Sequence, residues 1–385
     1  MARPPALPTW SIAGRPLMEG RVAFTPDSRH LVVHGVLDGA WLQIWDVAGR
    51  AVAITLDRHY LTGVGVGRGG ILAVARDRFL RVERRGRGWA AREFPHTLPG
   101  DDPADYGNHL WVRAMGVGAA ETVVVTRRWI ARVATADPGR LLGFHSFRQD
   151  MLGGGWGAVA VRRHRGRFVV SVADTDTSRF DMQNPDRAGV QYRFVTMLPD
   201  GRVQSELVIS GAEAELVCWV GGPTATAVLP PTGRRRAAVF HSPGGVAEVR
   251  PLAGGTAGWY FNFNVSASGQ AVVGVTRERV TRWTRDGRTP TTVAVPGRLW
   301  NAQVSPDGRR CVLLDNTRDC RPSGLAVDLD IGRVLGRCLG HPGSLTPAAF
   351  SPGGRLFASL VTHNTESDYP DRCRAGTVVV SDLGG

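Results

Sequence analysis

Lysine is absent from this sequence, so all 47 of its basic residues are arginine. The formal net charge of +13 is of the kind that indicates a nucleic-acid-binding surface. The arginines are dispersed, however, and the densest runs, at 84–87, 162–167 and 234–236, fall at expected turns or strand ends. A GC-rich genome explains an arginine-only composition more simply than selection for phosphate contacts does. We therefore treat nucleic-acid binding as a second alternative.

Long apolar runs are also lacking. No stretch approaches the ~18 apolar residues that a membrane span needs. The N-terminal residues MARPPALPTWSIAG have neither the charged nor the apolar region of a signal peptide. The sequence therefore predicts a monomeric cytoplasmic protein without membrane association.

Cysteine is scarce, and its spacing fits no metal site. The five cysteines form no C-x-x-C pair and have no paired histidine spacing, which argues against zinc. Their odd number, without a secretion signal, favours reduced thiols. Cys320 and Cys373 fall in loops of adjacent repeats, where a disulfide is conceivable, but two free thiols suit a reducing cytosol better. The others are Cys218, Cys311 and Cys338.

Catalytic motifs are missing as well. No G-x-S-x-G, H-E-x-x-H or Walker sequence occurs. Residues 174–177 resemble half of a calcium loop but lack its sixth-position glycine and its distal glutamate. His34, His145 and His241 fall in or beside expected strands, as core or rim residues do. We expect no metal and no cofactor, and we lean against an enzyme.

What the sequence does contain is an internal repeat. Each copy reads as a short strand ending in an apolar residue, then a turn and a second strand. The copies follow one another at intervals of 39 to 60 residues, which is room for the four strands of a propeller blade. The segments between them alternate as half-buried strands do, and none has the apolar period of a capped helix. The last apolar residues of the first strands, the repeat anchors, are Phe24, Val66, Val117, Ala160, Val220, Val265, Val304 and Phe350.

The two ends of the chain complete each other. The eighth copy stops after GTVVVSDLGG, its third strand, whereas TWSIAGRPLME near the N-terminus reads as an isolated fourth strand. Residues 8–19 are therefore expected to complete the last blade, which removes open sheet edges. The sequence predicts an all-β fold, a single propeller domain over residues 1–385 with eight four-stranded blades. Seven blades is the alternative, if the second or fifth copy is not a full blade.

Several segments resemble prokaryotic WD40 repeats. FSPGGR (350–355), VSPDGR (304–309) and FTPDSR (24–29) are similar to the first turn of such a repeat. WLQIWDVAGR (41–50) resembles its third strand, and LGH (339–341) resembles the Gly-His element that precedes a new blade. The resemblance implies a WD40-like propeller for the whole chain. The buried His–Ser/Thr–Asp–Trp network of that family is not supported by the residues of most blades.

Three long loops are expected between the second and third strands of blades four, seven and eight, on the face where WD40-like propellers usually bind. They cover residues 173–189, 315–324 and 362–376. Loops longer than about 12 residues are usually functional or disordered. Their carboxylates and arginines suit a polar protein interface. The candidate binding residues are Asp174, Asp176, Arg179, Asp186, Arg187, Arg318, Asp319, Arg321, Asp368, Tyr369, Asp371 and Arg372.

Five aromatic residues stand four or six positions before their repeat anchors. Even offsets place them on one side of the first strand, near its start. They form either a collar at the mouth of the axial channel, able to stack on a planar ligand or a cation, or wedges between neighbouring blades. These candidates are Tyr60, Trp111, Trp156, Trp259 and Trp300.

The leading hypothesis is a non-catalytic protein–protein interaction scaffold, which binds through the face formed by the three long loops. The alternative is a small-molecule or sugar-binding, or hydrolytic, propeller with its site at the axial channel mouth. Nucleic-acid binding through the arginine-rich surface is the second alternative.

Overall fold

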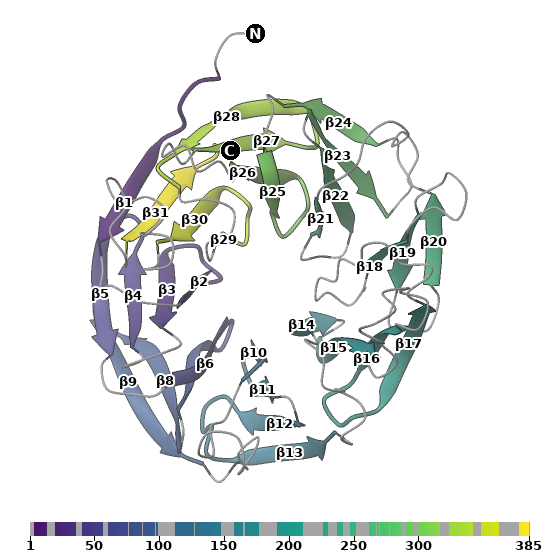
Figure 1. Cartoon of the computed structure of the whole chain (residues 1–385). Coiled ribbons are helices and arrows are strands. Elements are labelled where there is room, and N and C mark those ends of the chain that lie inside the picture. The colour runs from purple at the N-terminus through teal and green to yellow at the C-terminus, as the bar shows by residue number, and fades with distance from the viewer. Residues whose placement is uncertain are drawn as a thin grey trace, which may run out of the picture. The chain divides into compact units, whose positions relative to one another are not determined.

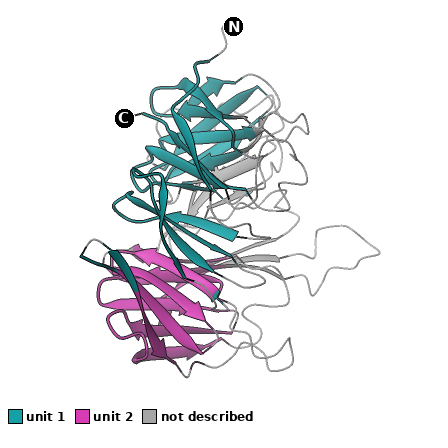
Figure 2. Ribbon diagram, turned by 90° about the vertical axis from the view of Figure 1, so that its left-hand side faces the viewer, with its two compact units in different colours: residues 1–61, 84–90, 258–385 teal, residues 62–83, 91–257 magenta. Residues whose placement is uncertain are grey.

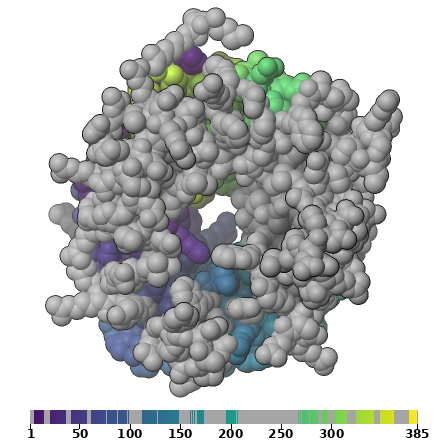
Figure 3. Space-filling model, in the orientation of Figure 1, coloured from purple at the N-terminus to yellow at the C-terminus, as the bar shows by residue number. Residues whose placement is uncertain are grey.

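The protein is described by a computed structural model in which every regular element is a β-strand over the residues described, as predicted (Figure 1). The described residues are 4–13, 20–35, 41–56, 61–75, 77–86, 88–96, 98, 112–126, 128–147, 158–164, 166–176, 191–210, 226–229, 237–241, 247–251, 262–266, 268, 270–276, 278–285, 290–295, 299–315, 323–341, 348–361 and 377–384. Figure 3 colours these residues along the chain on a space-filling surface.

The first of two compact units comprises residues 1–61, 84–90 and 258–385 (Figure 2). Its sheets have the strand orders β2-β3-β4-β5, β21-β22-β23-β24, β25-β26-β27-β28 and β1-β31-β30-β29. The strands are β1 (Thr9–Ala13), β2 (Gly20–Phe24), β3 (His30–Gly35), β4 (Leu42–Asp46), β5 (Ala51–Leu56), β21 (Asn262–Val265), β22 (Ala271–Val275), β23 (Arg279–Thr284), β24 (Thr291–Ala294), β25 (Leu299–Val304), β26 (Arg310–Asp315), β27 (Ser323–Asp328), β28 (Arg333–Leu339), β29 (Ala348–Phe350), β30 (Leu356–Leu360) and β31 (Thr377–Asp382).

The second unit comprises residues 62–83 and 91–257. The sheets with most of their residues here have the orders β6-β7-β8-β9, β10-β11-β12-β13, β14-β15-β16-β17 and β18-β19-β20. The strands are β6 (Leu61–Gly67), β7 (Gly70–Ala75), β8 (Arg78–Arg85), β9 (Gly88–Pro95), β10 (Ala114–Val117), β11 (Glu121–Val125), β12 (Trp129–Ala134), β13 (Leu141–Ser146), β14 (Ala158–His164), β15 (Arg167–Asp176), β16 (Gln191–Met197), β17 (Val203–Ser210), β18 (Thr226–Leu229), β19 (Ala237–His241) and β20 (Ala247–Pro251).

Strands that follow one another in sequence are neighbours in each sheet, and their pairing is antiparallel. Such a four-stranded meander is the blade of a β-propeller, so the predicted fold class is confirmed. The repeat anchors lie in or end the first strands β2, β6, β10, β14, β21, β25 and β29. Val220 lies outside the described residues. The predicted total of eight blades and the single domain stay predictions.

Polar side chains fix the turn after the first strand. In blade seven the Ser305 hydroxyl donates to the Asp307 carboxylate over 2.6 Å and accepts from the backbone N–H of Arg310 over 2.9 Å. Gly308 has a φ of 74°, and a Cβ there would lie 2.6 Å from the Cβ of Ala271. The Ser-Pro-Asp-Gly motif therefore serves the fold: its side chains satisfy the backbone of the turn, and its glycine adopts the left-handed conformation.

The N-terminal strand joins the C-terminal sheet, as predicted. β1 pairs with β31 from Thr9 opposite Ser381 to Ala13 opposite Thr377. The residues just before it also reach β28, since the N–H of Leu7 donates to the carbonyl of Arg337 over 2.9 Å. This segment thus closes the outer edge of one sheet and bonds to a second.

Each core lies between neighbouring sheets. In the first unit, Leu31 and Trp45 pack with Leu360 and Val380 from the C-terminal sheet. In the second unit, side chains from β7 and β8 pack with those from β11 and β12. Middle strands such as β3 are buried along their whole length, whereas the outer strand β13 is largely exposed. Among the described residues, exposed surface therefore concentrates at the turns and outer strands.

Candidate functional site

The three long predicted loops connect equivalent strands. Residues 177–190 join β15 to β16, residues 316–322 join β26 to β27, and residues 361–376 join β30 to β31. These are the second and third strands of their sheets, as predicted. The same connection takes only residues 126–128 and 276–278 in two other blades.

The short connections have a local chemical cause. The hydroxyl of Thr126 accepts from the N–H of Trp129 over 3.2 Å, and Thr276 accepts from Arg279 over 3.1 Å in the same way. A threonine that caps the backbone two and three residues ahead produces a tight turn. Val361 stands at this position in the eighth blade, where the connection is long.

The structure corrects the position of two candidate residues. β15 continues to Asp176, so Asp174 and Asp176 lie in a strand and not in the loop. Asp174 is paired in register with Arg193 of β16. Trp300 lies in β25, as expected. The other predicted binding residues lie outside the described residues: Arg179, Asp186, Arg187, Arg318, Asp319, Arg321, Asp368, Tyr369, Asp371 and Arg372 in the loops, and Tyr60, Trp111, Trp156 and Trp259 among the aromatics.

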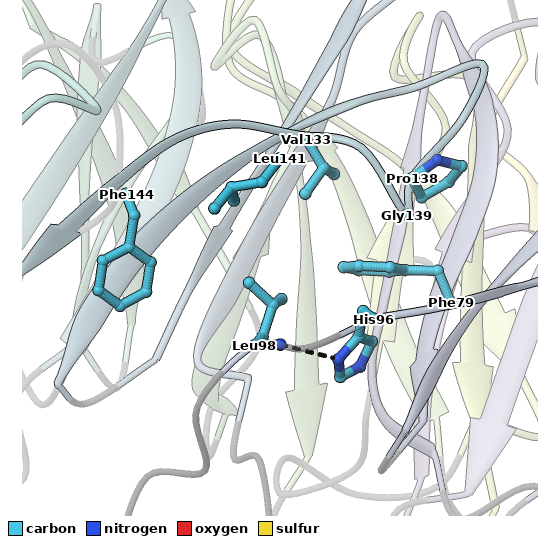
Figure 4. Close-up of a pocket in the computed structure, with 8 residues that line it drawn as sticks. All are labelled: Phe79, His96, Leu98, Val133, Pro138, Gly139, Leu141 and Phe144. Atoms are coloured by element: carbon cyan, nitrogen blue, oxygen red, sulfur yellow. Dashed lines mark hydrogen bonds between the residues drawn. The ribbon is translucent and has the colours of Figure 1, made fainter.

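A pocket in the second unit was not predicted from the sequence. It has a volume of about 270 Å³ and opens between the ends of β8 and β9 and the strand pair β12–β13 (Figure 4). Apart from His96, the side chains around it are apolar. The lining residues are Phe79, His96, Leu98, Val133, Pro138, Gly139, Leu141 and Phe144.

The side chain of His96 forms part of the pocket wall and is held in place by its own contacts. Its Nε2 lies 3.2 Å from the carbonyl of Ala75, to which it donates, and its Nδ1 accepts from the N–H of Leu98 over 3.3 Å. The ring also packs on Phe79, with 4.9 Å between ring centroids. Burial lowers the pKa of His96, so the ring is neutral at pH 7. Both ring nitrogens are therefore satisfied within the protein, and the pocket wall is otherwise apolar.

The outer strand β13 forms one rim of the pocket. Leu141, Leu142 and Phe144 are exposed by 49%, 40% and 42%. The register of β13 against β12 shifts between Arg132 and Val133, and this bulge makes Leu141 and Leu142 both face outward. Three large apolar side chains thus gather on one exposed edge. The sequence LLGFHS (141–146) shows that apolar residues cluster in this strand, but only the bulge shows that both leucines are exposed.

A buried polar relay ties the C-terminal sheet together. His341 Nδ1 lies 2.6 Å from the hydroxyl of Ser359, and its Nε2 lies 2.8 Å from the hydroxyl of Ser381. The Ser381 hydroxyl is also 2.8 Å from that of Thr9 in β1. The His341 ring therefore links the second and third strands of this sheet, and Ser381 stands at the position that Trp45 occupies in the first sheet. In the first blade, Trp45 is buried, and its Nε1 has no hydrogen-bond partner among the described residues.

Two cysteines and two histidines of the described ranges pack within the structure. Cys311 and Cys338 are buried free thiols, and burial raises the pKa of Cys338 to about 12, which keeps it protonated. His34 is buried, and His145 packs beside Phe147. Over the described residues no cluster of metal-ligating side chains occurs. In the same part of the chain no helix is long and apolar enough to cross a membrane.

Comparisons with known proteins give structural similarity only. No protein-family model and no curated protein matches the sequence. Among solved structures, the chain is similar to a eukaryotic initiation factor at 10% identity, covering 96% of this chain and 86% of that one with a TM-score of 0.49. It is also similar to the β-propeller domain of Myceliophteria thermophila Cps50 (Swd1) at 10% identity, covering 97% and 100% with a TM-score of 0.49. Functional inference therefore rests on the residues of this chain.

Proposed function

We propose that the protein is a non-catalytic scaffold that binds a protein partner through the long loops 177–190, 316–322 and 361–376. The observation that carries this proposal is their shared position: all three connect the second and third strands of their sheets. The equivalent turns at Thr126 and Thr276 are short and satisfied by a capping hydroxyl. The connections 177–190 and 361–376 are far longer than the three residues that suffice at this position, which points to a role beyond folding, and 316–322 is the shortest of the three.

The composition of the loops supports a protein ligand. They hold carboxylates and arginines together with Tyr369, and arginine and tyrosine are residue types that dominate binding energy at protein interfaces. Arg187 and Arg372 follow aspartates in the two similar segments 184–189 and 369–376. Charges of both signs favour a specific partner with complementary charges over a uniformly anionic polymer.

Loop replacement tests the proposal. Each long loop is replaced by a short Gly-Ser connection, and partners from the native lysate are captured by cross-linking and identified by mass spectrometry. We expect at least one protein to be captured by the wild type and lost with the loop variants. In the control variant, the connection between β23 and β24 is shortened within residues 286–289. This variant is expected to retain the partner. Capture that is independent of the loops, or that disappears with nuclease treatment, contradicts the proposal.

A further inference from the structure

The described residues that line the pocket beside β13 include none from the segments 177–190, 316–322 and 361–376, and its walls are largely apolar. Leu98, Val133 and Leu141 approach one another around it, and Phe144 and Phe79 stand at its sides (Figure 4). The only titratable group in the lining, His96, is neutral and bonded within the protein. The pocket therefore favours an apolar side chain over a charged group.

The adjoining strand offers backbone hydrogen bonds. β13 is the last strand of the order β10-β11-β12-β13, so within the described part of the chain one of its edges pairs with no other strand. An extended segment that adds to such an edge gains main-chain hydrogen bonds, and pockets for its side chains select the sequence. Leu141 and Phe144 belong both to the pocket lining and to this edge. One extended segment can therefore use both features.

The charge beside the pocket and of the whole chain indicates which kind of extended segment would bind along β13. Arg140 is exposed and lies between Gly139 and Leu141, two lining residues, and no carboxylate among the described residues pairs with it. Arg132, by contrast, is held by Glu121 over 2.7 Å. The chain as a whole carries a net charge of +13, so a second copy is repelled and an acidic partner is attracted.

We propose that β13 and the adjoining pocket form a second docking site, which takes an extended acidic segment of a partner protein. A leucine- or phenylalanine-sized side chain of that segment occupies the pocket, its backbone lies along β13, and an acidic residue beside the anchor meets Arg140. This site does not depend on the long loops, so the experiments that test it are independent of those that test the scaffold proposal.

A random peptide display library tests the site directly. Peptides selected on the wild-type protein are expected to share a leucine or phenylalanine flanked by aspartate or glutamate. Leu141→Ser removes the apolar rim, and Arg140→Glu reverses the neighbouring charge. Each is expected to weaken a selected peptide by about tenfold in a fluorescence anisotropy titration. Hydrogen exchange of the β13 amides is expected to slow when that peptide binds.

Two exposed residues of the first unit provide matched controls. Ile331→Ser removes a side chain that is 60% exposed, and Arg333→Glu reverses an exposed arginine at the start of β28. Both variants are expected to bind the peptide as the wild type does. The proposal is overturned if selected peptides are not acidic, if Leu141→Ser leaves their affinity unchanged, or if β13 is not protected. It is equally overturned if the wild type sediments as a dimer that Leu141→Ser dissociates, since the occupant is then a second copy.

Discussion

At the scale of single residues, His341 links acidity to stability. Burial lowers the pKa of His341 from its ordinary value of 6.5 to about 3. His34 is held at about 4 by burial and by the charge of Arg21. Below pH 6.5 the unfolded chain binds protons at these rings, whereas the folded protein keeps them neutral. The unfolded state then binds more protons, so stability falls as pH decreases.

We therefore expect the free energy of unfolding to fall between about pH 6.5 and pH 4, by at most about 1.4 kcal/mol per pH unit for each of the two rings. Denaturant titrations across this range measure the slope. His341→Gln removes one of the two titrating rings, so it is expected to reduce the slope of the free energy of unfolding against pH. An unchanged slope in that variant shows that other groups cause the pH dependence.

Ser381 is the second residue whose role can be isolated. Its hydroxyl contacts both His341 and Thr9, which places it between the buried ring and the N-terminal strand. Ser381→Ala leaves a buried imidazole nitrogen without a partner, and we expect a loss of about 1–3 kcal/mol in the free energy of unfolding. Ser11 is exposed on β1, so Ser11→Ala is the matched control with an expected change within about 0.5 kcal/mol. Equal effects from the two variants contradict a specific role for the relay.

At the scale of elements, the turn between the first and second strands places one residue in the left-handed conformation, which glycine adopts without strain in blade seven and Ser28 adopts with a φ of 60° in the first blade. Gly308 has a φ of 74°, and a Cβ added there would lie only 2.6 Å from the Cβ of Ala271. We expect Gly308→Ala to lower the free energy of unfolding by about 1–3 kcal/mol, measured by thermal or denaturant unfolding. Gly353 lies in the corresponding turn of the eighth blade, where a Cβ meets nothing within 4 Å and φ is not positive. Gly353→Ala is therefore expected to be neutral or slightly stabilising, and a reversed order contradicts the explanation.

The same elements show how far sequence reasoning extends. Repeat anchors such as Phe24 and Val304 were predictable, because an apolar residue before a Ser/Thr-Pro-Asp turn is a strong local signal. The pairing of β1 with β31 was predictable as well, since one end of the chain lacked the strand that the other end supplied. The start of the loop between β15 and β16 was not, because Asp174 and Asp176 read as loop residues until the pairing of their strand with β16 is known.

The pocket beside β13 lay beyond sequence reasoning for a different reason. Its walls come from β8, β12 and β13, and no local pattern in 79, 133 or 144 reports that these positions meet. The exposure of Leu141 and Leu142 depends on a register shift in the pairing with β12. Alternation rules assume regular pairing, so they assign one of two adjacent leucines to the interior.

At the scale of the whole molecule, the dominant property is uncompensated positive charge. The net charge is +13, and the ion pairs that offset it locally are largely solvent-exposed, as with Arg355 and Asp382 at 2.7 Å. Exposed pairs of this kind contribute about 0–1 kcal/mol each, whereas mutual repulsion of the excess arginines acts over the whole surface. Both effects are screened by salt, but with opposite consequences for stability.

Because repulsion exceeds local pairing in this balance, we expect the melting temperature to rise when NaCl increases from about 10 mM to about 150 mM, which shortens the screening length from about 30 Å to about 8 Å. Differential scanning calorimetry measures the shift, and sucrose at matched osmolarity controls for solvent exclusion, which raises stability without screening charge. Several arginines, Arg140 and Arg333 among them, have no ion-pair partner among the described residues, and replacing them by glutamine is expected to reduce the salt effect while raising the melting temperature at low salt. A melting temperature that falls with NaCl shows instead that the exposed ion pairs, and not the excess charge, dominate the electrostatics of the fold.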